Sequence, residues 1–441
     1  MDQERKELDG WEPMFERDIV HLPGAPIMPL SRRSLFLGLG AVGVFCTGGA
    51  ALWAWLGGRS DPMVRAHTEV ARLLPLGMVF DTDAMSESPE GMVLEGLRFS
   101  GGGTEGRIAH AVLREDALRL EGVEMWGGNG ILAARMLSLL GIDWERGLVR
   151  SGEAEEVAIA DAGRLGGVAA ARVRLLGWST WVPTRVELDH ARLAIRGGPA
   201  AGLDVSAASA VLSLDPTVAG EGSLGARWIR ALSAASLQEV SGTVAGQSAS
   251  AETLEVRLVA RDTAGDAAGI ELRATALDLG GDVMRWREAL LYPRMNAEAS
   301  LRAIRSQDGS WQADAAFSWP LAGSGEATLE ASGASSIWPD LSTLRWRRLS
   351  VSWRDAGLVR RLVEQSRAGR STAEAAAAMA ARFYDSALLE GAVSARLDLE
   401  RWFEGPGVMR LEMTGEGPMR DLSQILDLER PPGASTRLSL R

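Results

Sequence analysis

The chain has 441 residues, enough for a large folded body, with 47 lysine and arginine residues against 58 aspartate and glutamate residues. The formal net charge of −11 argues against binding to nucleic acid or to an anionic lipid surface, because both attract basic proteins. Cys46 is the only cysteine, so no disulfide can form within the chain and no Cys/His zinc set can be assembled.

An uncharged stretch from Leu35 to Leu56 organises the chain. At about 1.5 Å per residue a helix of this stretch is roughly 33 Å long, which is enough to cross a hydrocarbon core of about 30 Å. We therefore predict a transmembrane anchor over residues 35–57 and, before it, a disordered cytoplasmic tail over residues 1–34. Arg32 and Arg33 precede the span, and the positive-inside bias then places the amino terminus in the cytoplasm. The body is expected in the periplasm, outside the inner membrane.

A second interpretation of the same region is an export signal. Ser31-Arg32-Arg33-Ser34 followed by apolar residues is similar to a twin-arginine signal. The apolar run is long for a cleavable signal, whose apolar region has about 7–15 residues, and this favours retention as an anchor. Both routes deliver the body to the same compartment.

Small residues recur along the predicted span. Gly43, Thr47 and Ala51 stand at every fourth position, a spacing that lets a second membrane helix pack closely. They are the candidate contact with a membrane protein partner. A span that is simply rich in glycine and alanine would show the same spacing, so both interpretations stay open.

Beyond the anchor we predict a juxtamembrane helix over residues 62–75. We predict a β-rich body over residues 76–354, because apolar residues alternate there. The apolar phase changes around Gly122 and at Arg347–Arg348, which predicts β-bulges. Asp308-Gly309 predicts the turn of the clearest hairpin, because this pair accepts positive φ. The main predicted strands cover residues 93–99, 107–113, 118–126, 168–176, 205–214, 254–258, 270–279, 295–304, 311–319, 327–330 and 344–353.

Helices are predicted at a few places between the strands. One covers Ile131–Leu140, with Leu132, Met136, Leu139 and Leu140 on its buried side, and another covers Ala226–Leu237. Residues 355–441 predict a carboxy-terminal αβ cap. Its expected elements are a helix capped by Asp355 and ending at Arg367, an alanine-rich helix from the capping box at Ser371 to about Leu389, a strand over 393–397, a helical turn at Trp402-Phe403, a strand over 408–413 and a frayed end.

The order of these elements shows no βαβ rhythm, and the connections are short. This predicts an α+β fold that is mainly antiparallel β, arranged as a long curved open sheet or an incomplete barrel with a few short helices.

The carboxy-terminal stretch from Leu349 onward resembles a known architecture. The segments Leu349–Leu362 and Trp402–Leu411, with the alanine-rich helix between them, are similar to the close of uncharacterised bacterial envelope proteins with one amino-terminal span. Those proteins are AsmA-like in architecture. The resemblance implies a periplasmic β-rich body on an inner-membrane anchor, and an apolar groove of the kind thought to carry lipids. It brings no catalytic residue.

The sequence contains few motifs that point to catalysis or to ligand binding. It contains no nucleophile elbow, P-loop or dinucleotide fingerprint, and Asp81-Thr82-Asp83 lacks the further oxygen ligands of a calcium loop. The four histidines, His21, His67, His110 and His190, are widely separated and are expected to be structural. We predict no catalytic, cofactor-binding or metal-binding residues, while Trp319, Trp346 and Trp353 could line an apolar groove.

Three functions follow from these observations. The leading hypothesis is a non-enzymatic, membrane-anchored periplasmic protein of the cell envelope that binds or handles a lipid or another apolar ligand in a β-sheet groove. The second is a scaffold or assembly subunit of an inner-membrane complex. The third is a hydrolase exported by the twin-arginine route, which would require convergent carboxylates or a metal.

Overall fold

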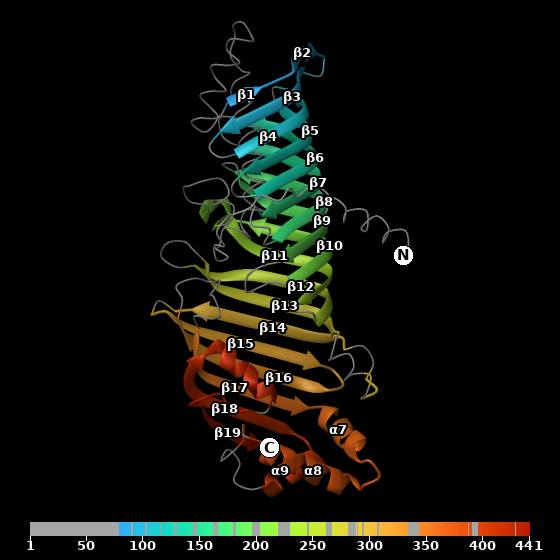
Figure 1. Ribbon diagram of the computed structural model, residues 1–441, viewed down its shortest axis with the longest axis vertical. Helices are drawn as coiled ribbons and strands as arrows, with labels where there is room; N and C mark the ends of the chain where they lie inside the picture. The colour runs from blue at the N-terminus through green and yellow to red at the C-terminus, as the bar shows by residue number, and fades with distance from the viewer. Residues whose placement is uncertain are drawn as a thin grey trace, which may run out of the picture.

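The computed structural model describes residues 79–441 except for short segments, of which 219–229 is the longest (Figure 1). The predicted tail, anchor and juxtamembrane helix lie outside the described residues, and so do Gly43, Thr47, Ala51, His21 and His67. Within the described residues, no helix is long and apolar enough to cross a membrane.

The described chain is dominated by strands that follow one another in a single sheet. The strands are β1 (Val79–Asp81), β2 (Ala84–Ser88), β3 (Gly91–Gly101), β4 (Thr104–Leu113), β5 (Ala117–Gly127), β6 (Gly130–Asp143), β7 (Leu148–Asp161), β8 (Gly166–Ser179), β9 (Val182–Ile195), β10 (Leu203–Leu214), β11 (Leu232–Val244), β12 (Gln247–Arg261), β13 (Ala267–Leu279), β14 (Ala297–Arg305), β15 (Ser310–Trp319), β16 (Gly323–Ser332), β17 (Arg345–Asp355), β18 (Val408–Pro418) and β19 (Ser435–Leu440). The helical segments are η1 (Pro216–Val218), α7 (Leu358–Ser366), α8 (Thr372–Tyr384), α9 (Arg396–Glu404) and η3 (Met419–Asp427).

From β3 to β19 each strand pairs antiparallel with the next strand along the chain. β1 and β2 both pair with the free side of β3, so they form one interrupted edge. The two ends of the sheet lie at opposite ends of the molecule (Figure 1). The prediction of a mainly antiparallel sheet is confirmed, and the sheet is open.

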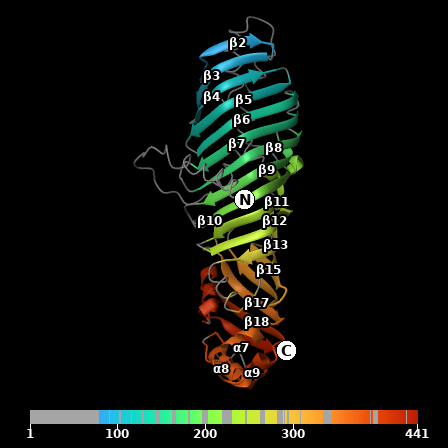
Figure 2. The same ribbon diagram turned by 90° about the vertical axis from the view of Figure 1, so that its right-hand side faces the viewer.

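One face of this sheet, which we call the inner face, is apolar along its length. On β12, for example, Leu254, Val256 and Leu258 alternate with the charged Glu255 and Arg257, which belong to the opposite, outer face. The helices α7, α8 and α9 lie at the carboxy-terminal end of the sheet (Figure 2). Their side chains pack with the fully buried Met413 of β18, so they cover the inner face there. Alternation of this kind is expected for an antiparallel sheet with one wet face.

A row of unusual backbone conformations, which we call the seam, crosses the sheet from β3 to β13. Glu95 pairs with His110 and Leu97 with Ile108, so Gly96 lies opposite Ala109. The same register continues through every ladder to β13. The seam residues are Gly96, Ala109, Gly122, Arg135, Glu156, Ala171, His190, Ala208, Glu239, Glu252 and Ala276. Those on β3, β5, β7, β9, β11 and β13 have φ between 49° and 60°, which interrupts the extended backbone of every second strand.

The seam changes which residues face inward. On β3 both Leu94 and Leu97 are buried, and on β6 both Ala134 and Leu137 are buried, although each pair is three residues apart. An uninterrupted strand would turn the members of such a pair to opposite faces. Because of the seam, both halves of each strand contribute apolar side chains to one continuous core over β3 to β10. The phase change predicted around Gly122 is confirmed, and it is one point on this seam.

The seam also explains the largest error of the sequence prediction. Residues Ile131–Leu140, predicted as a helix, belong to strand β6. The buried side chains of β6 are separated by two residues in some places and by three in others, at Leu132, Ala134, Leu137 and Leu139. A separation of three resembles the repeat of a helix. The predicted helix over Ala226–Leu237 is wrong from Leu232 onward, because residues 232–237 belong to β11. Arg230 and Ala231 are helical, and residues 226–229 lie outside the described residues.

The carboxy-terminal prediction was correct in outline and wrong in detail. The capping box at Ser371 is present, and the bulge near Arg347 appears as register shifts between β16, β17 and β18. Asp355 accepts hydrogen bonds from the backbone N–H groups of Gly357 and Val359, both at 2.9 Å, at the start of α7. However, α8 ends at Tyr384, and residues 396–397 begin helix α9 where a strand was predicted. The end of the chain is not frayed, because β19 continues the sheet.

Candidate functional site

The histidines and acidic residues singled out in the sequence do not converge on a reactive centre. His110 Nδ1 lies 2.7 Å from Glu95 Oε1, and His190 is part of the seam. Asp83 is engaged by Arg98. Among the residues that the structure describes, no group of three or more histidine, cysteine, aspartate or glutamate side chains is placed to hold a metal ion.

The tryptophans proposed to line a groove lie in two different environments. Trp346 is fully buried and Trp319 is 8% exposed, so both belong to the packed interior. Trp353 is half-buried and lies against Gly323 and Gly325 of β16. The two buried side chains support the sheet and cannot contact a ligand on its surface.

Side chains that the sequence did not single out form a partly buried apolar row on the inner face. The ladders place these residues side by side across seven consecutive strands, and we call the row the apolar strip. It consists of Ala235, Val256, Leu272, Leu301, Ala315, Ala327 and Val351, on β11 to β17 in order.

The apolar strip lies between two buried regions of the inner face. Toward the amino terminus is the core of β3 to β10, and toward the carboxy terminus is the core beneath α7, α8 and α9. Each member of the strip is half-buried, and none belongs to the buried clusters found among the described residues. The neighbouring row on β12 to β15, Leu254, Ala274, Ala299 and Phe317, is also apolar and half-buried. Several adjacent strands thus leave apolar area in contact with solvent, a feature typical of binding surfaces.

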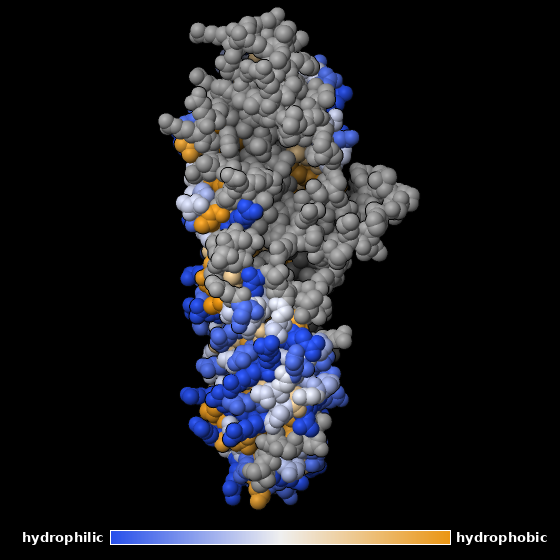
Figure 3. All heavy atoms as spheres, turned by 90° about the vertical axis from the view of Figure 1, so that its left-hand side faces the viewer, coloured by the Kyte–Doolittle hydropathy of each residue, from blue (hydrophilic) through white to orange (hydrophobic). Residues whose placement is uncertain are grey.

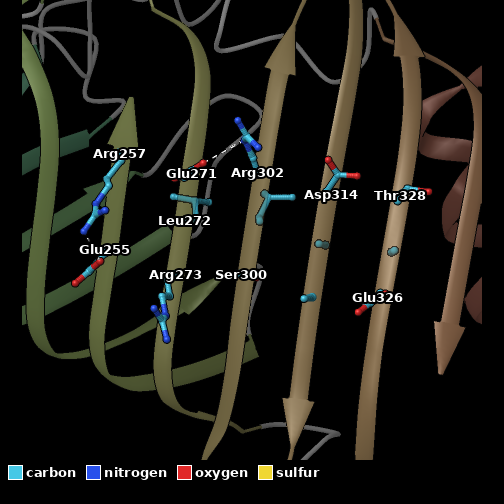
Figure 4. A pocket seen from close by; sticks show the side chains of 14 residues that line it. Glu255, Arg257, Glu271, Leu272, Arg273, Ser300, Arg302, Asp314, Glu326 and Thr328 are labelled. Carbon is cyan, nitrogen blue, oxygen red and sulfur yellow. Dashed lines mark hydrogen bonds and ion pairs between the residues drawn. The ribbon is translucent and has the colours of Figure 1, made fainter. Parts of the chain in front are cut away.

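The outer face behind the strip is polar, and the carboxy-terminal part of the molecule presents mostly hydrophilic residues in Figure 3. A shallow hollow of about 520 Å³ lies there over β12 to β16 (Figure 4). One row along it reads Arg257, Glu271, Arg302 and Asp314, with opposite charges on successive strands.

The charges in this hollow largely neutralise one another. Arg302 Nε is 3.1 Å from Glu271 Oε1, and Arg257 Nη2 is 3.2 Å from Glu255 Oε2. All four side chains are well exposed, so these pairs are worth little in stability. Arg273 forms no ion pair within the described part of the chain. The arrangement is that of a solvated sheet face.

At the carboxy-terminal boundary of the strip, a polar contact fixes α7 to the loop between β13 and β14. The Arg361 guanidinium carbon lies 4.1 Å from the centroid of the Tyr292 ring, and Arg361 also donates to the carbonyl oxygens of Leu290 and Leu291. Burial raises the pKa of the Tyr292 phenol, and the positive charge of Arg361 opposes this. The phenol donates to the Leu321 carbonyl oxygen at 3.2 Å. These contacts hold the helix that closes one end of the strip.

Comparison with known proteins adds no assignment. No family model matches the chain, and no curated protein matches it. The resemblance of the carboxy-terminal segments to AsmA-like envelope proteins therefore stays a prediction.

Proposed function

We propose that this chain is a non-enzymatic, membrane-anchored protein of the cell envelope that holds an acyl chain of a lipid against its apolar strip. The observation that carries the proposal is the strip itself, a continuous row of apolar side chains that are only partly buried, between two filled cores. The anchor predicted over residues 35–57, with a periplasmic body, supplies the cellular setting.

The dimensions of the strip suit an acyl chain. Seven neighbouring strands are separated by six steps of about 4.8 Å, which gives a length of about 29 Å. A hydrocarbon core of about 30 Å holds two leaflets, so one lipid chain extends over about 15 Å. The strip is long enough to bury such a chain along its full length. Each methylene group removed from water contributes about 0.8 kcal/mol, so contact with even part of a chain is favourable.

The strip also has the chemistry that an acyl chain requires. Its members are alanine, valine and leucine, and the charged residues of the same strands, such as Glu271 and Arg302, belong to the outer face. A charged or strongly polar ligand would gain no hydrogen-bond partner from these side chains, whereas an acyl chain needs none. This favours a lipid over a polar metabolite.

Mass spectrometry of lipid that co-purifies with the full chain tests the proposal. The protein is extracted from membranes in detergent, and bound lipid is quantified per protein molecule for three forms. Leu272→Glu places a carboxylate in the middle of the strip and should remove most of the bound lipid. Arg273→Gln is the matched control, because it changes the neighbouring outward side chain, and it should retain lipid at the level of the unmodified protein.

Two results would contradict the proposal. One is the absence of lipid above the level found with an unrelated single-span protein prepared in the same detergent. The other is equal lipid content in the Leu272→Glu and Arg273→Gln variants, with circular dichroism showing that both are folded.

A further inference from the structure

Two adjacent rows of the inner face, across β11 to β17, carry one polar side-chain atom between them. The first row is the apolar strip, which consists of alanine, valine and leucine. The second is the neighbouring row, which starts at Leu237 on β11 and continues beyond Phe317 to Gly325 on β16 and Trp353 on β17. Within these two rows the indole N–H of Trp353 is therefore the single side-chain hydrogen-bond donor.

Two glycines of β16 leave room for the Trp353 indole. A Cβ atom added to Gly325 would lie 3.1 Å from Cε3 of the indole, and one added to Gly323 would lie 2.8 Å from Cε2. The six-membered ring thus contacts both glycines and occupies space that side chains would otherwise fill. A larger residue at position 325 would push against the ring, so the sequence of β16 sets the position of this tryptophan beside the strip.

The N–H group of this indole is available to a ligand. Trp353 is partly exposed, and its Nε1 atom donates no hydrogen bond to another described residue. It differs in this from the Nε1 atoms of Trp311, Trp346 and Trp402, which are buried without a partner. A tryptophan with a packed ring and an accessible N–H suits a place where an apolar ligand ends in a polar group.

The two ends of the strip differ in what they offer to the polar end of a lipid. At the amino-terminal end the ladders continue the row from Ala235 through β10 to Val186 on β9 and Leu175 on β8. Val186 is 2% exposed and Leu175 is 0% exposed, so a polar group there would lose water without gaining a hydrogen bond. At the carboxy-terminal end the indole N–H of Trp353 is a donor. The polar end of a lipid is therefore favoured at β17.

We propose that Trp353 fixes the direction of the bound lipid. Its indole N–H donates a hydrogen bond to a carboxyl oxygen at the head of the acyl chain, and the chain extends from β17 toward β13. This inference rests on the proposed function, because it assigns a direction to the lipid held at the apolar strip. A carboxylate and a carboxylic ester both contain an oxygen acceptor, so a free fatty acid and a glycerolipid share the recognised chemistry.

The length of an acyl chain predicts which residues its methyl end reaches. Neighbouring strands are about 4.8 Å apart, so a chain of about 15 Å that begins at β17 spans about three steps and ends at β14. The methyl end should lie at Leu301 on β14, close to Leu272 on β13, while the head lies at Val351 and Trp353 on β17. A chain bound in the opposite direction would exchange these two sets of residues.

Two photoreactive fatty acids that differ only in the position of the diazirine test this direction. The first carries the diazirine beside the carboxyl group and the second carries it near the methyl end. The full chain is labelled in membranes, and mass spectrometry identifies the modified residues. We expect the first probe to modify Val351 and Trp353 and the second to modify Leu301 and Leu272. A phosphatidylcholine that carries the second chain distinguishes the two sources, because labelling of Leu301 by it identifies a glycerolipid as a ligand.

A change of one side chain tests the hydrogen bond. Trp353→Phe removes the N–H group but keeps an aromatic ring on the glycines. Lipid should still co-purify, because the strip is intact, but the ratio of β17 to β14 labelling by the first probe should fall about two- to tenfold, as expected for one hydrogen bond. Trp126→Phe is the matched control: Trp126 on β5 donates its N–H to Glu105 at 3.0 Å, outside the strip, and its loss should leave the ratio unchanged.

A second change displaces the indole without altering Trp353. Gly325→Val places two methyl groups where the ring lies and should reduce the same labelling ratio. Ser324→Val is its control, because Ser324 is exposed on the outer face of the same strand, and it should leave the ratio unchanged.

Three results would overturn the inference. They are modification of the same residues by both probes, modification of the two ends in the opposite order, and an unchanged ratio in a Trp353→Phe protein that circular dichroism shows to be folded. If neither probe modifies the inner face of β11 to β17, lipid binding at the strip is itself refuted, so failure of the direction and failure of the proposed function are distinguishable.

Discussion

Replacing Gly122 by alanine tests whether the seam is a required feature of the sheet. Gly122 has φ of +60°, and a Cβ atom added there would lie 2.8 Å from the Cβ atom of Ala109 on β4. A residue with a Cβ atom costs about 1–2 kcal/mol in this conformation. Crowding in a packed sheet costs about 1–3 kcal/mol. Alanine recovers about 0.5–1 kcal/mol through lower entropy of the unfolded chain, which leaves a net destabilisation of about 1–4.5 kcal/mol.

Gly309→Ala is the matched control for this change. Gly309 also has positive φ, +81°, but no atom lies within 4 Å of an added Cβ atom. The crowding cost is therefore absent, and the conformational cost less the recovered entropy leaves about 0–1.5 kcal/mol. Native-state hydrogen exchange should be measured over β4 to β6 for Gly122→Ala and over β14 and β15 for Gly309→Ala. A loss of about 1–4.5 kcal/mol accelerates exchange by about 5- to 1600-fold, because each 1.4 kcal/mol is tenfold. Equal acceleration in the two variants would refute the role assigned to the seam.

Two further predictions follow from local geometry. Ala276→Gly should be neutral or stabilise β13 by up to about 1 kcal/mol, because glycine removes the conformational cost of φ at +49°. Ala274→Gly, on ordinary extended backbone, should destabilise β13 by about 0.5–1 kcal/mol. Native-state hydrogen exchange over β13 measures both changes. Hydrogen bonds from the Ser371 N–H and hydroxyl lower the pKa of Glu374, so its stabilising effect on α8 is present above the ordinary pKa of 4.5 and is lost as pH falls through the lowered value. Glu374→Gln should abolish this acid dependence of exchange in α8, and an unchanged pH profile would contradict the assignment.

The strand-rich class could be predicted because alternation is a local property. Leu254 to Leu258 alternate without interruption, and Asp308-Gly309 gives the β14–β15 turn that was expected. The phase change at Gly122 was visible because glycine is the residue that accepts positive φ most readily. These features need no knowledge of distant parts of the chain.

The extent of the seam could not be predicted from the sequence. Glu156, His190 and Ala276 adopt positive φ without being glycine, because neighbouring strands impose the conformation. Arg135, opposite Glu156, binds the carboxylates of both Glu155 and Glu156, and these ion pairs span the seam. Propensity scales treat such residues one at a time and cannot detect a constraint shared by eleven strands.

The candidate site was only partly predictable for a related reason. An apolar surface on the sheet was expected, but its lining was assigned to tryptophans, and Trp346 and Trp319 are buried. The strip consists of smaller residues such as Leu272 and Leu301, whose sequence pattern matches that of the buried core of β3 to β10. Their exposure depends on where the amino-terminal core ends and where α7 begins, which is a property of the tertiary structure.

The most direct test of the central claim is photo-cross-linking of a fatty acid that carries a diazirine near the end of its chain. The full-length protein is labelled in membranes, and the modified residues are identified by mass spectrometry. The account predicts modification on the inner face of β11 to β17, at Leu272, Leu301 and their neighbours in the apolar strip. Modification of outer-face residues such as Ser300 and Ala316, or none in these strands, would contradict it.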